Sequence, residues 1–209
     1  MTTPVQVDHW DALADDERIV RTVKALEANN ITPIVVSSGA EARQKIYELI
    51  PEGAEVLTAT SATLQEIGLV PEINESGRYV SIRKQIMVLN RETQAIEIRR
   101  LGATPEYVVG SVHAVTEQGY LMVASFGGSQ LAPYVYGAGR AIWVVGTNKL
   151  VKDMDEGFQR IEQRSLPLES ERLFKAVGRH SEIGKILIVR KEPNPTRSTV
   201  ILVKEKLGF

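Results

Sequence analysis

The sequence predicts an α/β protein with a mainly parallel, Rossmann-like sheet that is flanked by helices. Two strand–turn–helix units follow one another in residues 34–50 and 56–68, and this succession favours parallel strands joined by right-handed crossovers. Residues 107–148 hold only two charged side chains, Glu117 and Arg140, although 24% of the whole chain is charged. Strands with so little charge are typical of the middle of a sheet that is covered on both faces.

Length and composition predict one compact domain over residues 1–209, with residues 1–30 as an N-terminal helical segment that packs on it. The 25 basic and 26 acidic residues nearly cancel, which leaves no electrostatic footprint for nucleic acid or an anionic membrane. The N-terminus is acidic and polar, and no apolar run approaches the roughly 20 residues needed to cross a bilayer. We therefore expect a cytoplasmic protein without a secretory signal.

The chain contains no cysteine, so it can form no disulfide, no thiolate nucleophile and no iron–sulfur cluster held by its own thiolates. The three histidines, His9, His113 and His180, are scattered and show no local metal-ligand spacing. We therefore predict no metal site, with assembly from distant residues as the alternative. No pattern in the sequence names a cofactor.

In the first half of the chain, residues 15–30 form a helical pattern with Asp15 or Asp16 near its N-cap. Residues 34–36 are expected to form a strand, followed by a turn and a helix over 40–50. The same order recurs with a strand at 56–57, a hydroxyl-rich turn, and a helix that Gly68 ends. Residues 79–101 indicate one long helix, or two helices with a break near Asn90.

In the second half, four apolar runs at 107–109, 112–115, 121–124 and 142–145 are predicted as the central strands of the sheet. Residues 153–164 and 168–177 are expected to form amphipathic helices on the outside. Two further strands are predicted at 185–190 and 199–203, on either side of a proline-containing turn.

Small polar residues follow three of the predicted strands and precede helical patterns. In a parallel sheet such turns lie at the carboxyl ends of the strands, where helix N-termini offer free N–H groups to anions. The turns therefore predict a cleft for a phosphate or carboxylate, and the alternative is that they are ordinary N-caps and tight turns. The candidate ligand-binding residues are Ser37, Ser38, Gly39, Thr60, Ser61, Thr63, Gly127, Gly128 and Ser129.

Glu117 is the candidate reactive residue. A carboxylate in a nearly charge-free and partly dry setting is expected to have a raised pKa and to serve as a nucleophile or general acid/base. Gly119 would let the backbone turn beside it, and we count this glycine with the site. The alternative is a structural carboxylate that caps a turn or pairs with Arg140.

Two further residues lie close enough in the sequence or the sheet to join the site. His113 stands four residues before Glu117, and Lys149 follows the strand at 142–145. His113 could take part in catalysis and Lys149 could meet an anionic ligand, whereas the alternatives are a buried histidine bound to backbone and a surface lysine. Tyr134, Tyr136 and Trp143 could line an apolar pocket or simply pack in the core.

Three stretches, GSVHAVTEQGYLMVASFGGSQL, GAGRAIWVVGTNKLV and VILVKEKLGF, resemble the LUD-domain, or lactate-utilisation, proteins. TATSATLQEIGL is similar to a strand–turn–helix motif of the same family, so the resemblance covers nearly the whole chain after Ile31. It implies a fold related to sugar-phosphate isomerases, deaminases and CoA transferases, the NagB/RpiA/CoA-transferase-like group. In class I CoA transferases a catalytic glutamate precedes Asn-Gly and apolar residues, and the similar residues 116–121 put Glu117 in the nucleophile's place. Many LUD proteins have Glu-Thr-Gly-Thr there, whereas this chain has Gln118 and Tyr120.

These observations together predict a function in lactate or organic-acid metabolism. We expect an anionic small molecule at the carboxyl edge of the sheet with Glu117 as the reactive carboxylate, in a transferase- or isomerase-like enzyme. The alternative, which the resemblance implies, is a non-catalytic subunit of an oxidative complex whose partner proteins carry the iron–sulfur clusters. Self-association into a homo-oligomer is a further expectation.

Overall fold

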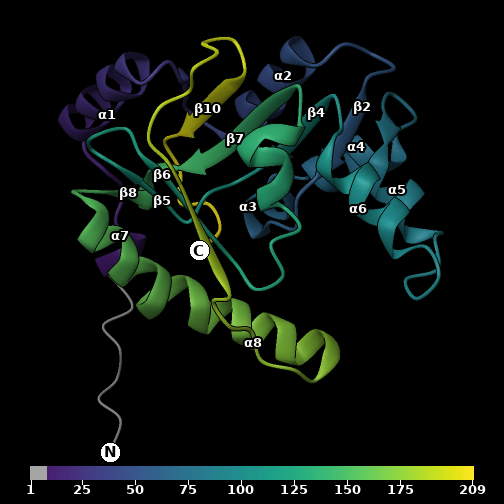
Figure 1. The fold of residues 1–209 in the computed structure, drawn as a ribbon. Coiled ribbons are helices and arrows are strands. Elements are labelled where there is room, and N and C mark those ends of the chain that lie inside the picture. The colour runs from purple at the N-terminus through teal and green to yellow at the C-terminus, as the bar shows by residue number, and fades with distance from the viewer. Residues whose placement is uncertain (1–8) are drawn as a thin grey trace, which may run out of the picture.

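The computed structural model describes residues 9–209 and shows two β-sheets with helices around them (Figure 1). The larger sheet has six strands, and every pairing in it is parallel. Its order is β1 (Thr32–Val36), β10 (Ser198–Val203), β7 (Arg140–Gly146), β4 (Tyr107–Gly110), β2 (Glu55–Thr58) and β3 (Val80–Ser81). The predicted α/β class with a mainly parallel sheet is confirmed.

The second sheet has four strands and mixed directions. Its order is β8 (Leu150–Val151), β5 (Ala114–Thr116), β6 (Leu121–Ser125) and β9 (Lys185–Val189). Strand β6 runs antiparallel to both β5 and β9, whereas β5 and β8 are parallel. The prediction that 112–115 and 121–124 lie in the middle of one sheet with 107–109 and 142–145 is therefore wrong.

Burial on both faces explains why β5 and β6 resemble central strands of a parallel sheet. Val115 and Leu121 face the larger sheet, while Ala114 and Met122 face the opposite way, toward Trp10 and Ile161. An antiparallel sheet covered on both faces loses the usual apolar–polar alternation, so its strands resemble those of a central parallel sheet. The two arrangements cannot be told apart by hydrophobicity alone.

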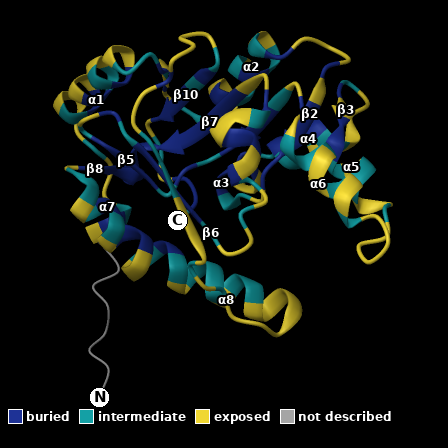
Figure 2. Cartoon of the chain, in the orientation of Figure 1, coloured by how far each residue is buried: buried dark blue, intermediate teal, exposed yellow. Residues whose placement is uncertain are grey.

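The helices cover the larger sheet on both faces. On one face lie α2 (Gly39–Leu49), α3 (Ala62–Glu66) and α4 (Leu69–Glu75), whose apolar residues share a core with β7 and β10. On the other face lie α1 (Asp16–Ala28), α5 (Ile82–Met87), α6 (Ala95–Ala103) and the second sheet. Figure 2 shows the resulting buried strands at the centre and exposed residues on the outer helix faces.

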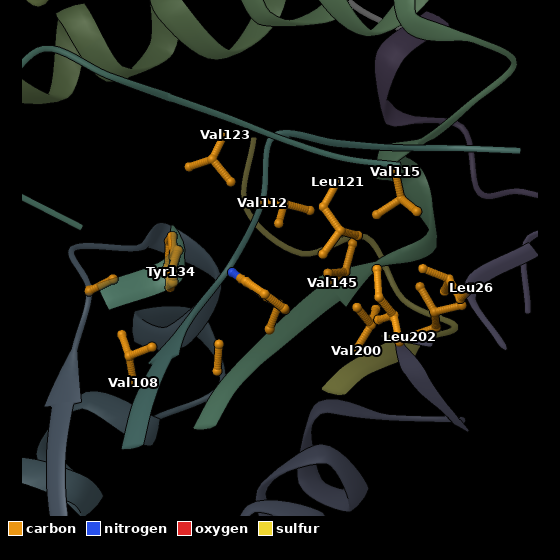
Figure 3. Close-up of a cluster of buried hydrophobic side chains, with 14 of the residues drawn as sticks. Leu26, Val108, Val112, Val115, Leu121, Val123, Tyr134, Val145, Val200 and Leu202 are labelled. Atoms are coloured by element: carbon orange, nitrogen blue, oxygen red, sulfur yellow. The ribbon is translucent and has the colours of Figure 1, made fainter. Parts of the chain in front are cut away.

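The core between the two sheets contains side chains from both. Val145, Val200 and Leu202 of the larger sheet form one cluster with Leu121 and Val115 of the second (Figure 3). Leu26 places α1, which lies within the predicted N-terminal segment 1–30, in the same cluster. Residues 1–8 of that segment lie outside the described residues.

Side-chain caps define where several helices begin. Asp15 accepts a hydrogen bond from the backbone N–H of Arg18 at 2.7 Å and so caps α1, as the sequence predicted. Ser38 and Ser61 cap α2 and α3 in the same way. The predicted break near Asn90 separates α5 from α6, although Val80–Ser81 form an edge strand beside β2 instead of the start of a helix.

The two helices predicted at 153–164 and 168–177 are one continuous rod (Figure 1). It consists of α7 (Met154–Arg160), a π-helical turn η4 (Ile161–Ser165) and α8 (Leu166–Val177). The wider π turn lies just before Pro167, which has no N–H to donate and whose ring crowds the preceding turn. The helix therefore continues where the sequence predicted an interruption.

Three short helical turns remain among residues 9–209, and two of them connect the two sheets. A 3₁₀ turn η1 (His9–Asp11) precedes α1, and a second 3₁₀ turn η3 (Thr147–Lys149) links β7 directly to β8. A π-helical segment η2 (Pro133–Gly137) follows β6. Phe126, Val135 and Tyr136 are more than half exposed, so the charge-poor stretch 107–148 is buried along its strands and only partly buried between β6 and β7.

Candidate functional site

A cavity of about 300 Å³ lies where the carboxyl ends of β2, β4 and β7 meet the second sheet and the helix α7–α8. Such a position, outside the carboxyl ends of parallel strands, is where open α/β sheets commonly bind ligands. The predicted site residues that line it are Thr60, Ser61, Thr63, His113, Gly127, Ser129 and Lys149.

Lys149 is the central charged residue of this cavity. It is the last residue of η3, and only 2% of it is exposed. Its Nζ donates to Thr63 Oγ1 at 2.8 Å and to Ser111 Oγ at 3.2 Å. None of the ion pairs found among residues 9–209 includes it. Lys149 is thus a buried amine and not the surface lysine of the alternative interpretation.

The surroundings of Lys149 lower its pKa to about 7. Burial is the largest cause, because it penalises the charged form, and the positive charge of Arg160 adds to it. The charge of Glu66 acts in the opposite direction but does not offset them. Both the ammonium and the amine form of Lys149 are therefore populated near neutral pH.

Arg160 brings a second positive charge close to the cavity wall. It ends α7 just before Ile161, which lines the cavity, and it is fully buried. Its Nη1 donates to the carbonyl oxygen of His113 at 2.6 Å, whereas its Nε and Nη2 have no hydrogen-bond partner among the described residues. No sequence pattern marked Arg160 as a site residue, because a basic residue on an amphipathic helix normally faces solvent.

The charges of both cations act on His113, and its ring stays neutral. Burial and the positive charges of Lys149 and Arg160 lower its pKa to about 3. Its Nδ1 accepts a hydrogen bond from the backbone N–H of Ala124 at 3.1 Å, so the proton of the neutral ring resides on Nε2. His113 therefore offers an N–H donor and does not act as a base at neutral pH.

Two hydroxyl groups at the start of α3 complete the polar wall. Ser61 Oγ accepts from the N–H of Leu64, and Thr60 Oγ1 accepts from the guanidinium of Arg83 at 2.9 Å. Because each oxygen accepts from the protein, its own O–H remains available to donate. Burial lowers the pKa of Arg83, yet it keeps a positive charge behind Thr60.

Glu117 does not lie in the ligand-binding cleft, where the sequence predicted it as the reactive carboxylate. Its carboxylate accepts from Arg18 Nε at 2.8 Å and from Arg21 Nε at 3.0 Å, both on α1, and it does not line the cavity. Burial alone would raise its pKa, but the hydrogen bonds and charges of Arg21 and Arg18 outweigh burial and lower it. The expected raised pKa is thus wrong, and the ion-pair partners of Glu117 are Arg18 and Arg21 instead of Arg140, which the alternative interpretation named.

The other predicted site residues outside the cavity have structural partners. The N–H groups of Ser37 and Gly39 donate to the carboxylates of Glu41 and Glu205, so the chain itself fills the anion site at the start of α2. Gly119 has a φ of 75° in the turn between β5 and β6, where a Cβ would strike the backbone of α1. The predicted residues that do not line the cavity are Ser37, Ser38, Gly39, Glu117, Gly119 and Gly128.

Only two of the three predicted turns therefore meet. The turn after β6 belongs to the second sheet, and it reaches the cavity because that sheet packs face to face against the larger one. The turn after β1 lies at the far edge of the six-stranded sheet. Among the aromatic candidates, Tyr134 lines the cavity and packs against Trp143 with ring centroids 5.3 Å apart, while Tyr136 is 87% exposed.

The described residues contain neither a metal-binding cluster nor a membrane-spanning helix. No group of three or more His, Asp or Glu side chains in residues 9–209 is arranged to hold a metal ion. No helix in the same part of the chain is long and apolar enough to cross a membrane.

The fold and the cavity together define an α/β protein with a small polar site at the carboxyl ends of its central strands. Residues 19–203 match the LUD domain, so the chain belongs to the LUD domain family. It is also similar in structure to a DUF162 family protein from Deinococcus radiodurans, with 14% identity and a TM-score of 0.56 over 92% of this chain and 99% of that chain. That likeness shows the fold, and the search of curated proteins gave no match.

Proposed function

We propose that this LUD-domain protein binds a small organic anion of lactate or related organic-acid metabolism in the cavity around Lys149. The observation that carries the proposal is a buried lysine whose hydrogen bonds go to two hydroxyls and which pairs with no carboxylate of residues 9–209. A buried charge without a counter-ion is costly, and an anionic ligand would supply the missing partner. The family's name agrees with this class of metabolite.

The size and lining of the cavity favour a small acid over a nucleotide or an entire CoA molecule. About 300 Å³ is at the lower end of the range for small-molecule sites. The donors around it are the hydroxyls of Thr60 and Ser61 and the Nε2–H of His113. Arg160 adds positive charge from behind the wall, which favours a ligand of negative charge.

Isothermal titration with lactate, pyruvate and inorganic phosphate tests the proposal. We expect Lys149→Met to weaken binding at least about tenfold, because the ligand loses its charge partner. Lys204→Met is the matched control, since Lys204 pairs with Asp16 on the surface away from the cavity. Equal binding by wild type and Lys149→Met, or no binding of any of the anions, would contradict the proposal.

The pH dependence gives an independent signature. Lys149 carries its charge below a pKa of about 7 and loses it above, so anion binding should weaken as the pH rises through neutrality. Lys149→Arg keeps the charge at every accessible pH and should bind with a flat profile over the same range. Isothermal titrations between about pH 6 and pH 8 measure the pH dependence of anion binding for the wild type and for Lys149→Arg.

The sequence-based role of Glu117 as the reactive carboxylate is tested in the same assays. Because its carboxylate is held by Arg18 and Arg21 outside the cavity, we expect Glu117→Gln to bind lactate, pyruvate and phosphate as the wild type does. A loss of anion binding or of turnover without loss of folding would restore Glu117 to the mechanism.

A second candidate function is that of a non-catalytic subunit beside partner proteins that carry iron–sulfur clusters. Met87 and Val88 at the end of α5 favour it, because they are 75% and 84% exposed and adjacent apolar side chains suit an interface. Co-purification from the native cell tests it, and Met87→Lys should reduce the recovery of partners. Recovery of the protein alone, on lactate as on other carbon sources, would count against this function.

A further inference from the structure

The arrangement around Lys149 supports covalent chemistry as well as charge attraction. We propose that Lys149 forms an imine with the carbonyl group of a small 2-oxo acid, while His113 donates a hydrogen bond from Nε2 to the carbonyl oxygen. This inference rests on the proposed anion site and deepens it by naming the class of ligand. Four observations on the residues of the cavity carry it.

The first observation is the environment of the amine. Nζ of Lys149 is almost fully buried and lies between Thr63 Oγ1 and Ser111 Oγ, two neutral oxygens. A carboxylate partner would hold the nitrogen as an ammonium ion, which has no lone pair for attack. Two hydroxyl oxygens can instead accept the two N–H groups of a neutral amine, because each hydroxyl donates its own hydrogen to a backbone carbonyl, and the lone pair of the nitrogen stays free.

The second observation is the fixed tautomer of His113. The backbone N–H of Ala124 occupies Nδ1, so the ring presents Nε2–H as a neutral donor in the same cavity as Lys149. A neutral imidazole N–H can polarise a carbonyl group without transferring a charge. His113 would thereby make the carbonyl carbon a better electrophile for Lys149.

The third observation is a separate place for the acid group of the ligand. The hydroxyls of Thr60 and Ser61 accept hydrogen bonds from the protein and keep their own O–H groups free for a carboxylate. Arg83 supports Thr60 from behind with a positive charge. A 2-oxo acid has its carboxylate and carbonyl on adjacent carbons, so a compact cavity can hold both groups at once.

The fourth observation is the balance of charges on the amine. The charged groups that act on Lys149 are Glu66 from α3 and Arg160 from α7, and their net effect with burial is a pKa of about 7. A substantial fraction of neutral amine therefore exists near neutral pH, whereas an ordinary surface lysine would be almost entirely protonated.

The proposed step is balanced and involves no oxidation or reduction. The lone pair of Nζ forms a bond to the carbonyl carbon, and the C=O π electrons move to oxygen, which takes up a proton released from the nitrogen. The resulting carbinolamine loses its hydroxyl and the second N–H hydrogen as water. The products are one C=N bond and one molecule of water.

Reductive trapping tests the proposal. The full chain is incubated with pyruvate and sodium cyanoborohydride, and intact-mass and peptide mass spectrometry locate the product. We expect one reduced pyruvate adduct on the peptide that contains Lys149, and no adduct with lactate, which has no carbonyl group. An adduct confined to other lysines would overturn the proposal.

Lys149→Arg separates this inference from the anion site. Arginine keeps the positive charge but cannot form the imine. This variant should therefore bind pyruvate, and the yield of trapped adduct should fall at least about tenfold relative to the wild type. Pyruvate binding by the wild type without any adduct would overturn the imine and leave the anion site intact. His113→Gln should slow trapping of pyruvate at Lys149, because the carbonyl group loses its polarising donor, and melting temperatures show that the variants are folded.

Discussion

Glu117 shows how one residue can have a conspicuous sequence position and an ordinary structural role. It is the only acid in a charge-poor stretch of 42 residues, which led us to expect a dry carboxylate with a raised pKa. The structure places two arginines of α1 against it, and they lower that pKa instead. Counting charges along the chain could not find these partners, because they lie about 100 positions earlier in the sequence.

We predict that Glu117→Gln lowers the free energy of unfolding by about 1 kcal/mol at pH 7, because a partly exposed pair of ionic hydrogen bonds is lost. The lowered pKa of Glu117 determines how this contribution to the free energy of unfolding changes with pH. The contribution is complete above the unfolded pKa of about 4.3 and disappears as the pH falls through the folded pKa. Urea unfolding at pH 7 and in acid measures both. If the difference in free energy of unfolding between the wild type and Glu117→Gln increased in acid, this account of Glu117 would be contradicted.

Lys149 shows the reverse, because its sequence position is ordinary and its structural environment is unusual. Its sequence position after a strand favoured a surface lysine over a ligand contact, whereas the structure buries it beside two hydroxyls. The signal in the sequence was its place just after the carboxyl end of a charge-poor strand. Burial followed from the second sheet, which no local pattern revealed.

At the scale of elements, the turns and helix starts were largely predictable from local chemistry. Asp15, Ser38 and Ser61 cap their helices because their side-chain oxygens satisfy the first free N–H groups. The π turn at residues 161–165 and the pairing of β9 with β6 were not predictable in this way, because each depends on what packs against the element.

The close approach of β4 to η2 gives a prediction at this scale. A Cβ at Gly110 would overlap the hydroxyl of Tyr134, whereas a Cβ at Gly127 would meet nothing within 4 Å. Gly110→Ala should therefore reduce the free energy of unfolding by about 1–3 kcal/mol. Gly127→Ala should change it by less than about 0.5 kcal/mol. Urea midpoints compare the two, and equal midpoints would show that β4 has room to move away from Tyr134.

At the scale of the whole molecule, the two sheets share one hydrophobic core. Leu121 of the second sheet is fully buried in the same cluster as Val145 and Leu202 of the larger sheet (Figure 3). The cavity lies beside this core, and its walls come from both sheets and from the helix α7–α8. The position of the site therefore depends on the docking of the two sheets.

We predict that the two sheets unfold together. Leu121→Ala should cost about 2–5 kcal/mol, because the deletion leaves a cavity in the shared core. Unfolding should remain a single transition, the same by tryptophan fluorescence and by far-ultraviolet circular dichroism. Two separate transitions, or a variant in which only part of the chain melted early, would show that the sheets are independent units.

The sequence by itself determined the α/β class, most element positions and the membership of the LUD domain family, because periodicity, capping residues and family motifs are local properties of the chain. It also marked seven of the residues that line the cavity. Only the tertiary structure decided that β5 and β6 form a second sheet, that Glu117 pairs with α1, and that Lys149 and Arg160 are buried together. Each of these depends on side chains from distant parts of the chain, since burial and charge pairing are set by which surfaces meet and not by neighbours in sequence.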